Sequence, residues 1–213
     1  MFDYYTSVII PLTALFPLIT ALLWFRDTGT HGKVLFWFVL ISAVINQVAI
    51  YVSHYSTNTL YFYHGYAVVE FTMLSAFYSC FFITRYKKLI WFIVLLFVIA
   101  CIINIIYFQH KEEYNSYTRT LGALIIVIYS LLLSYRHFNL SQGSWASSGI
   151  NWFNTGILLY YASSAIMFAF FNYIIRMPLP IFDAIWGTHC ALLAIEYTFF
   201  AIGYYKQHAA NAR

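Results

Sequence analysis

Charged side chains are scarce in this sequence. Asp, Glu, Lys and Arg together make up 8% of the 213 residues, whereas hydrophobic residues make up 62% and the mean hydropathy is +0.74. A soluble domain usually carries roughly 25% charged residues. The composition therefore excludes a soluble globular domain and indicates an integral membrane protein. Because no soluble part is left once the apolar runs are removed, we expect residues 1–213 to form a single membrane domain.

Cysteine is also scarce, and the common catalytic motifs are missing. The three cysteines, Cys80, Cys101 and Cys190, each lie inside an apolar run, and no pair has metal-ligand spacing. This pattern excludes a disulfide framework and is typical of small buried hydrophobic residues. The sequence contains no GxSxG motif, no Walker-type glycine loop and no HExxH motif. An enzyme is therefore less favoured than a protein that binds or moves a ligand.

Apolar runs of about 19 to 26 residues follow one another along the chain, each long enough to cross ~30 Å at 1.5 Å per residue. Short polar separators divide them. The fold class we expect is an all-α polytopic membrane protein, a bundle of seven transmembrane helices, with Pro11 and Pro17 kinking the first helix. The seven runs are 6–25, 34–53, 60–84, 88–108, 118–136, 148–173 and 181–205.

Lysine and arginine are unevenly divided between the two sides of such a bundle. One side has eight of these residues and the other has three, namely Lys111, Arg119 and Arg176. Since cytoplasmic loops carry the excess of Lys and Arg, we expect the N-terminus outside and the C-terminus in the cytoplasm. The shortness of the loops favours a multi-pass protein of the bacterial inner membrane. The formal net charge of +4 reflects these loop residues and gives no reason to expect nucleic acid binding.

Two glutamates, Glu70 and Glu196, lie inside apolar runs, where a carboxylate costs several kcal/mol unless it is paired, protonated or facing water. Counting from the outer ends of their runs places Glu70 ~15 Å deep, His189 ~12 Å and Glu196 ~22 Å. Glu70 and His189 are therefore expected at similar depth, where they can pair if their helices are neighbours.

A polar pocket in the outer half of the bundle would lower the cost of these groups by letting water or a ligand solvate them. The competing hypothesis is local pairing, of Glu70 with a tyrosine hydroxyl or His189, and of Asp183 with Arg176. The residues predicted to bind a ligand or ion are His64, Tyr66, Glu70, Trp186, His189 and Glu196, and those predicted at the rim are His54, Asp183 and Arg176.

The function favoured by this pattern is a sensor or receptor that binds a small ligand or ion in an outward-facing pocket. Lys206–Arg213 offers no output domain, so a signal would pass to a separate protein or a second copy of the chain. The alternative is a small secondary transporter coupled to protons or ions through Glu70 and Glu196. A metal-dependent membrane enzyme is the third hypothesis.

No organic cofactor is predicted. A retinal protein needs a Schiff-base lysine in the middle of its last helix, and run 181–205 contains no lysine. A metal ion stays open as a ligand, with His64, Glu70 and His189 as candidate ligands by residue type. The expected partners are the lipid bilayer and a small ligand or ion.

Overall fold

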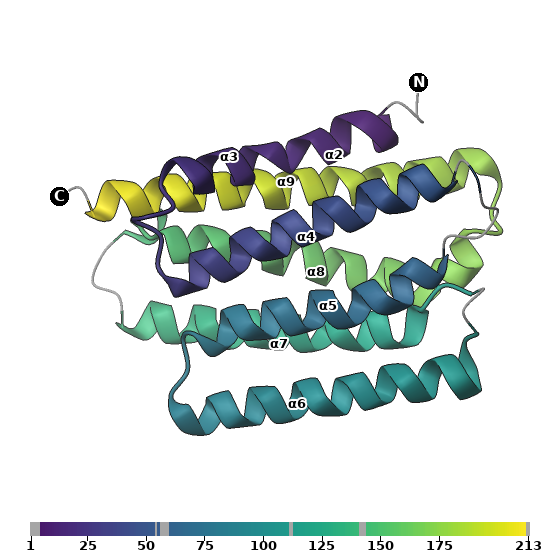
Figure 1. Cartoon of the computed structure of the whole chain (residues 1–213), viewed down its shortest axis with the longest axis horizontal. Coiled ribbons are helices and arrows are strands. Elements are labelled where there is room, and N and C mark those ends of the chain that lie inside the picture. Colours follow the sequence, from purple (N-terminus) through teal and green to yellow (C-terminus); the bar gives the residue numbers. More distant parts are fainter. Residues whose placement is uncertain (1–4, 54, 56–59, 111–112, 141–143, 212–213) are drawn as a thin grey trace.

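The computed structural model describes residues 5–53, 55, 60–110, 113–140 and 144–211, and within these ranges it contains helices and no strand (Figure 1). The main helices are α3 (Leu15–Leu23), α4 (Thr30–Ser53), α5 (Leu60–Ser79), α6 (Thr84–Ile103), α7 (Ser116–Leu140), α8 (Gly149–Ile174) and α9 (Leu179–Asn211). The short ones are η1 (Tyr5–Ile9), α2 (Ile10–Thr13), η2 (Asn104–Phe108) and η3 (Trp145–Ser147).

Five of the described helical segments are long and apolar enough to cross a membrane. They are Thr30–Val52, Thr84–Phe108, Ser116–Arg136, Gly149–Ile174 and Leu179–Asn211. Large apolar side chains stay exposed along them, such as Trp91, Phe92 and Leu95 of α6. Without lipid these side chains would meet water at a large free-energy cost, so length, composition and surface all support a membrane protein.

The N-terminal segment is a helix whose hydrogen-bond ladder is interrupted by its prolines. Pro11 and Pro17 lack an N–H, and the α-helical pattern stops between α2 and α3, at Ala14. Ala14 keeps helical angles, with φ −62° and ψ −22°, and the two helices follow one line in Figure 1. The prolines therefore interrupt hydrogen bonds without unwinding the chain.

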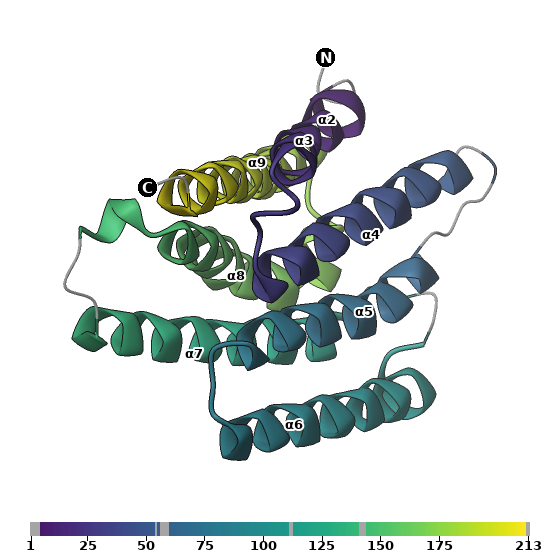
Figure 2. The same cartoon turned by 60° about the vertical axis from the view of Figure 1, so that its left-hand side comes forward.

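The helices lie roughly side by side, with α9 packed on α8, α8 on α7, and α4 on α5 (Figures 1 and 2). The connections α3–α4, α5–α6 and α7–α8 lie at the same end of the bundle as the C-terminus. We call this the basic end because the exposed residues Arg26, Arg85, Lys87 and Lys88 lie there. The N-terminal segment begins at the opposite end, and the other three connections lie there.

Glycines bring α8 and α9 into close contact near the basic end. A Cβ added to Gly149 would collide with the backbone oxygen of Gly203, and one added to Gly203 would collide with the ring of Phe153. Small residues at such positions let the backbones of two membrane helices approach one another. This contact fixes the two longest neighbouring helices against each other.

One predicted separator lies elsewhere in the structure. The polar stretch 85–88 was expected between two spans, but it forms part of the first turns of α6. The chain turns instead at the apolar residues before it, where Cys80 and Phe81 donate backbone hydrogen bonds to Phe77 and Tyr78. Hydropathy marks polar residues near a membrane end, but it does not say whether they lie in the turn or in the helix.

The C-terminal residues also differ from the prediction, which ended the last span at residue 205. Helix α9 continues to Asn211, and its last turns lie on the α3–α4 connection. His208 Nδ1 lies 2.7 Å from Asp27 Oδ2, and Asn211 Nδ2 donates to the Asp27 carbonyl at 2.8 Å. Residues 206–211 are therefore a docked part of the bundle.

Candidate functional site

Glu70 forms a buried ion pair with Arg119, a residue that the sequence analysis had counted among the loop cations. Nη2 of Arg119, on α7, lies 2.9 Å from Glu70 Oε2, and both residues are 7% exposed. Tyr161, on α8, donates its hydroxyl to Glu70 Oε1 at 2.7 Å. Both carboxylate oxygens are therefore paired, and the pairing joins α5, α7 and α8.

Aromatic rings surround the Arg119 guanidinium. Its central carbon lies 4.3 Å from the ring centre of Phe168, and 5.8, 5.5 and 5.7 Å from those of Tyr63, Tyr66 and Tyr114. Such rings attract a cation through their quadrupoles. Arg119 Nε has no hydrogen-bond partner among the described residues. The guanidinium thus keeps an unused donor inside an aromatic cage.

A hydrogen-bonded loop between η2 and α7 positions Tyr114 and Arg119. The Tyr114 backbone N–H donates to Asn172 Oδ1 at 3.2 Å, and Asn172 Nδ2 donates to the Tyr114 carbonyl at 3.0 Å. Asn104 Nδ2 donates to Asn115 Oδ1 at 3.1 Å. Burial raises the pKa of the Tyr114 hydroxyl, so this group stays neutral beside the guanidinium.

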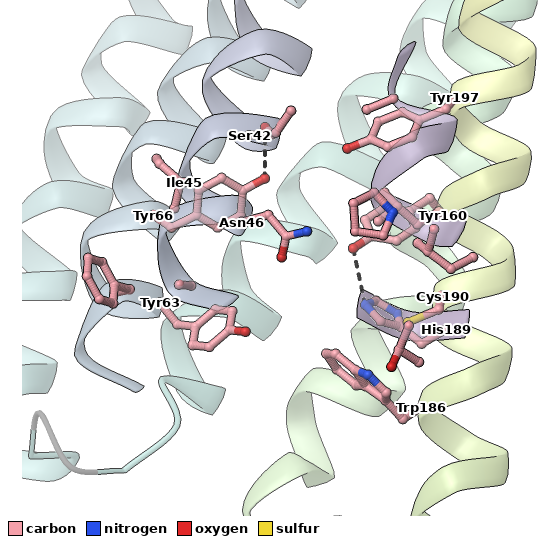
Figure 3. Close-up of a pocket in the computed structure, with 18 of the residues that line it drawn as sticks. Ser42, Ile45, Asn46, Tyr63, Tyr66, Tyr160, Trp186, His189, Cys190 and Tyr197 are labelled. Carbon is pink, nitrogen blue, oxygen red and sulfur yellow. Dashed lines mark hydrogen bonds between the residues drawn. The ribbon is translucent and has the colours of Figure 1, made fainter. Parts of the chain in front are cut away.

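A cavity of about 130 Å³ lies beside this cage, between α4 and α5 on one side and α9 on the other (Figure 3). The N-terminal segment also lines it through Thr6, Ile10 and Pro11. Of the six residues predicted to bind a ligand, Tyr66, Trp186 and His189 line the cavity, together with Arg119. Their role in ligand binding stays a prediction.

His189 does not bond to Glu70, the partner that depth matching suggested. Its Nε2 lies 3.2 Å from the Tyr160 hydroxyl (Figure 3). Its Nδ1 lies 3.0 Å from Ser164 Oγ. Depth along a helix does not determine the direction in which a side chain points, and α8 supplies these nearer partners. His189 is linked to the ion pair through Phe168, whose ring lies 5.6 Å from the His189 ring and 4.3 Å from the Arg119 guanidinium.

Several polar groups of the cavity wall have no partner in the described part of the chain. The side chains of Asn46, Tyr63 and Tyr197 point into the cavity in Figure 3 and make no hydrogen bond with a described residue. The indole N–H of Trp186, which also lines the cavity, makes no hydrogen bond with a described residue either. Hydroxyl, amide and indole groups are all donors, so the wall is rich in unused donors.

His64 and Glu196 do not line the cavity. His64 Nε2 lies 3.0 Å from the Glu113 carbonyl, which can only accept, so this nitrogen carries the proton and ties α5 to the loop before α7. Glu196 is 2% exposed, and its Oε1 has no hydrogen-bond partner among the described residues. Such an unpaired polar atom is costly in a membrane protein and calls for an explanation.

Neither of the predicted rim residues that the structure describes lines the cavity. His54 lies outside the described residues. Asp183 is half-buried and Arg176 is exposed, and the ion pairs formed by described residues are Glu70–Arg119 and Asp27–His208. The competing hypothesis that Asp183 pairs with Arg176 is therefore wrong.

The three candidate metal ligands each have a different partner. Glu70 contacts Arg119 and Tyr161, while His64 and His189 bond elsewhere, and the described residues contain no group of three or more His, Cys, Asp or Glu side chains that could hold a metal ion. Metal binding stays a prediction.

No protein-family model, curated protein or solved structure matches this chain.

Proposed function

We propose that this protein is a seven-span sensor or receptor that binds a small ligand in an outward-facing cavity and signals through a separate partner. In this proposal the N-terminal segment and α5 cross the membrane together with the five long apolar helices. The alternation of connections between the two ends of the bundle supports this arrangement (Figure 1).

The charge distribution supports an outward-facing cavity. Because Arg119 is buried in an ion pair, the side opposite the basic end keeps only Lys111 and Arg176 as sequence cations. The excess of Lys and Arg at the basic end becomes larger, and the positive-inside rule places that end in the cytoplasm. The cavity, lined by the N-terminal segment and the first half of α5, then opens outward.

The observation that carries the proposal is the chemistry of the cavity wall. Asn46, Tyr63, Trp186 and Tyr197 offer unused donors, and Arg119 adds a cation whose Nε is unpaired. Arg119 lines the cavity and its partner Glu70 does not, so the cavity meets the cationic side of this ion pair. The wall therefore suits a compact ligand with an apolar or aromatic body and an anionic, hydrogen-bond-accepting group. A cavity of about 130 Å³ has room for roughly ten water-sized positions, which limits such a ligand to roughly ten non-hydrogen atoms.

Benzoate is a suitable probe of this proposal, with benzylammonium as its cationic counterpart. We expect benzoate at about 100 times its Kd to raise the unfolding temperature of the purified protein by roughly 5 °C or more, since a ligand stabilises only the folded state that binds it. We expect Asn46→Ala to reduce this rise. Gln47→Ala is the matched control, because Gln47 is also exposed on α4 but does not line the cavity.

Two outcomes would contradict the proposal. Equal stabilisation by benzoate and benzylammonium would show that the wall does not select an anion. An equal response of Asn46→Ala and Gln47→Ala would show that the probe binds elsewhere.

Transport is a second candidate because Glu196 is buried with an unpaired oxygen, as in a residue that exchanges a proton or an ion. Proteoliposomes with a trapped pH-sensitive dye separate the two functions. The transporter hypothesis expects an imposed pH gradient to collapse in the parent protein and in Glu113→Gln, but to persist in Glu196→Gln. The sensor proposal expects the gradient to persist in all three. Glu113 is the control because it is exposed in a loop.

A further inference from the structure

A second hollow, unrelated to the cavity, lies between α6 and α7. It is a groove of about 510 Å³ near the basic end, and it includes the α5–α6 turn residues Phe82 and Ile83. Figures 1 and 2 place α6 along one edge of the bundle, so the groove faces the region that lipid occupies around a membrane protein.

The walls of this groove are apolar over most of its length. Leu89, Ile90 and Ile93 contribute from α6, and Tyr129 and Leu132 contribute from α7. Ile90 is buried, whereas Leu89 and Leu132 are exposed by about half, at 51% and 50%. A hydrocarbon chain fits such a surface without leaving a buried polar group unpaired.

The end of the groove nearest the α5–α6 turn is cationic. Arg136 lines it and is held in place by a hydrogen bond from its Nη1 to the Phe81 carbonyl. Arg85, Lys87 and Lys88 are exposed on the first turns of α6, next to the lining residue Tyr86. The groove lining contains no acidic residue. A phosphate at this end would meet Arg136 and the basic first turns of α6 without acidic competition.

Tyr129 lines the groove at intermediate depth. The Tyr129 hydroxyl is buried and has no hydrogen-bond partner among the described residues. Tyr129 lies seven residues before Arg136 on α7, or ~10 Å deeper along the helix.

We infer that the groove binds one anionic phospholipid, with its phosphate at Arg136 and an acyl chain between α6 and α7. The amphiphilic pattern of the groove, an apolar length with a cationic end, matches an acidic lipid and not a zwitterionic one. The inference stands on residues separate from those of the proposed ligand cavity, so either can fail without the other.

Native mass spectrometry of the full chain in detergent tests this inference. With equimolar phosphatidylglycerol and phosphatidylcholine added, we expect one retained phosphatidylglycerol per protein. Arg136→Gln should weaken retention about fivefold, the effect of removing roughly one favourable cationic contact. Arg26→Gln is the control, an exposed arginine at the same end that does not line the groove.

A second pair of variants tests the groove without removing a charge. Leu132→Trp should fill the groove and abolish retention, whereas Leu131→Trp should leave it unchanged. Both leucines are exposed to nearly the same extent on α7, at 50% and 53%, but only Leu132 lines the groove. The inference would be overturned by equal retention of the two lipids or by equal effects of the two tryptophan substitutions. It would also be overturned if the parent protein were a dimer and Leu132→Trp made it a monomer, because the groove would then bind a second copy of the chain.

Discussion

Replacing Arg119 by leucine is expected to destabilise the folded protein by about 3–5 kcal/mol, because Glu70 would remain buried without its counter-charge. The hydroxyl of Tyr161 would still donate to Glu70, but a neutral donor does not compensate a full charge. The measurement is the unfolding midpoint of the purified protein in one fixed detergent. Glu70→Leu should be similarly destabilising, since it leaves the guanidinium buried.

The double variant Glu70→Leu/Arg119→Leu separates the ion pair from simple packing loss. Replacing both charges by apolar groups of similar volume is often neutral or stabilising. We therefore expect the double variant to be more stable than either single variant, although it should no longer bind benzoate. Simple additivity of the two single effects would contradict the pairing of these side chains.

Gly149→Ala is expected to have the second large effect. The added methyl group collides with the backbone oxygen of Gly203, which cannot move without separating α8 from α9. Overpacking of a close contact typically costs about 1–3 kcal/mol. The unfolding midpoint should fall, and benzoate stabilisation should weaken because α8 and α9 both contribute to the cavity wall.

Gly65→Ala is the matched control for this substitution. Gly65 lies within α5, and a Cβ there meets nothing within 4 Å. Alanine is favoured over glycine by about 1 kcal/mol inside a helix. The two substitutions should therefore move the midpoint in opposite directions. A fall of equal size in both variants would show that the contact at Gly203 is not the cause.

The helical architecture could be predicted from the sequence because each apolar run is long and uninterrupted. Each of the seven predicted runs overlaps one or more helices of the structure, and five of these segments are long and apolar enough to span a membrane. The boundaries were less predictable. The end of α5 at Ser79 and the extension of α9 to Asn211 depend on turn geometry and docking, which hydropathy does not encode.

The partner of Glu70 was missed because Arg119 lies only one residue inside run 118–136 and resembled a loop cation. One signal could have identified it: a carboxylate deep in an apolar run requires a cation, and Arg119 is an arginine inside such a run. The tyrosines gave no comparable signal. With 20 tyrosines in the chain, the sequence does not single out Tyr161 for Glu70 or Tyr160 for His189.

If α9 tilts as a rigid body about its close approach to α8 at Gly203, the helix has two arms of unequal length. The arm that carries Trp186 and the cavity wall is about 25 Å long, and the arm that ends at Asn211 is about 12 Å long, from the rise of an α-helix. If a ligand tilts the cavity wall by 2 Å about this fulcrum, the far tip moves about 1 Å the opposite way. Because Asp27 holds that tip through His208 and Asn211, the motion would be delivered to the α3–α4 connection at the cytoplasmic face of the proposed receptor.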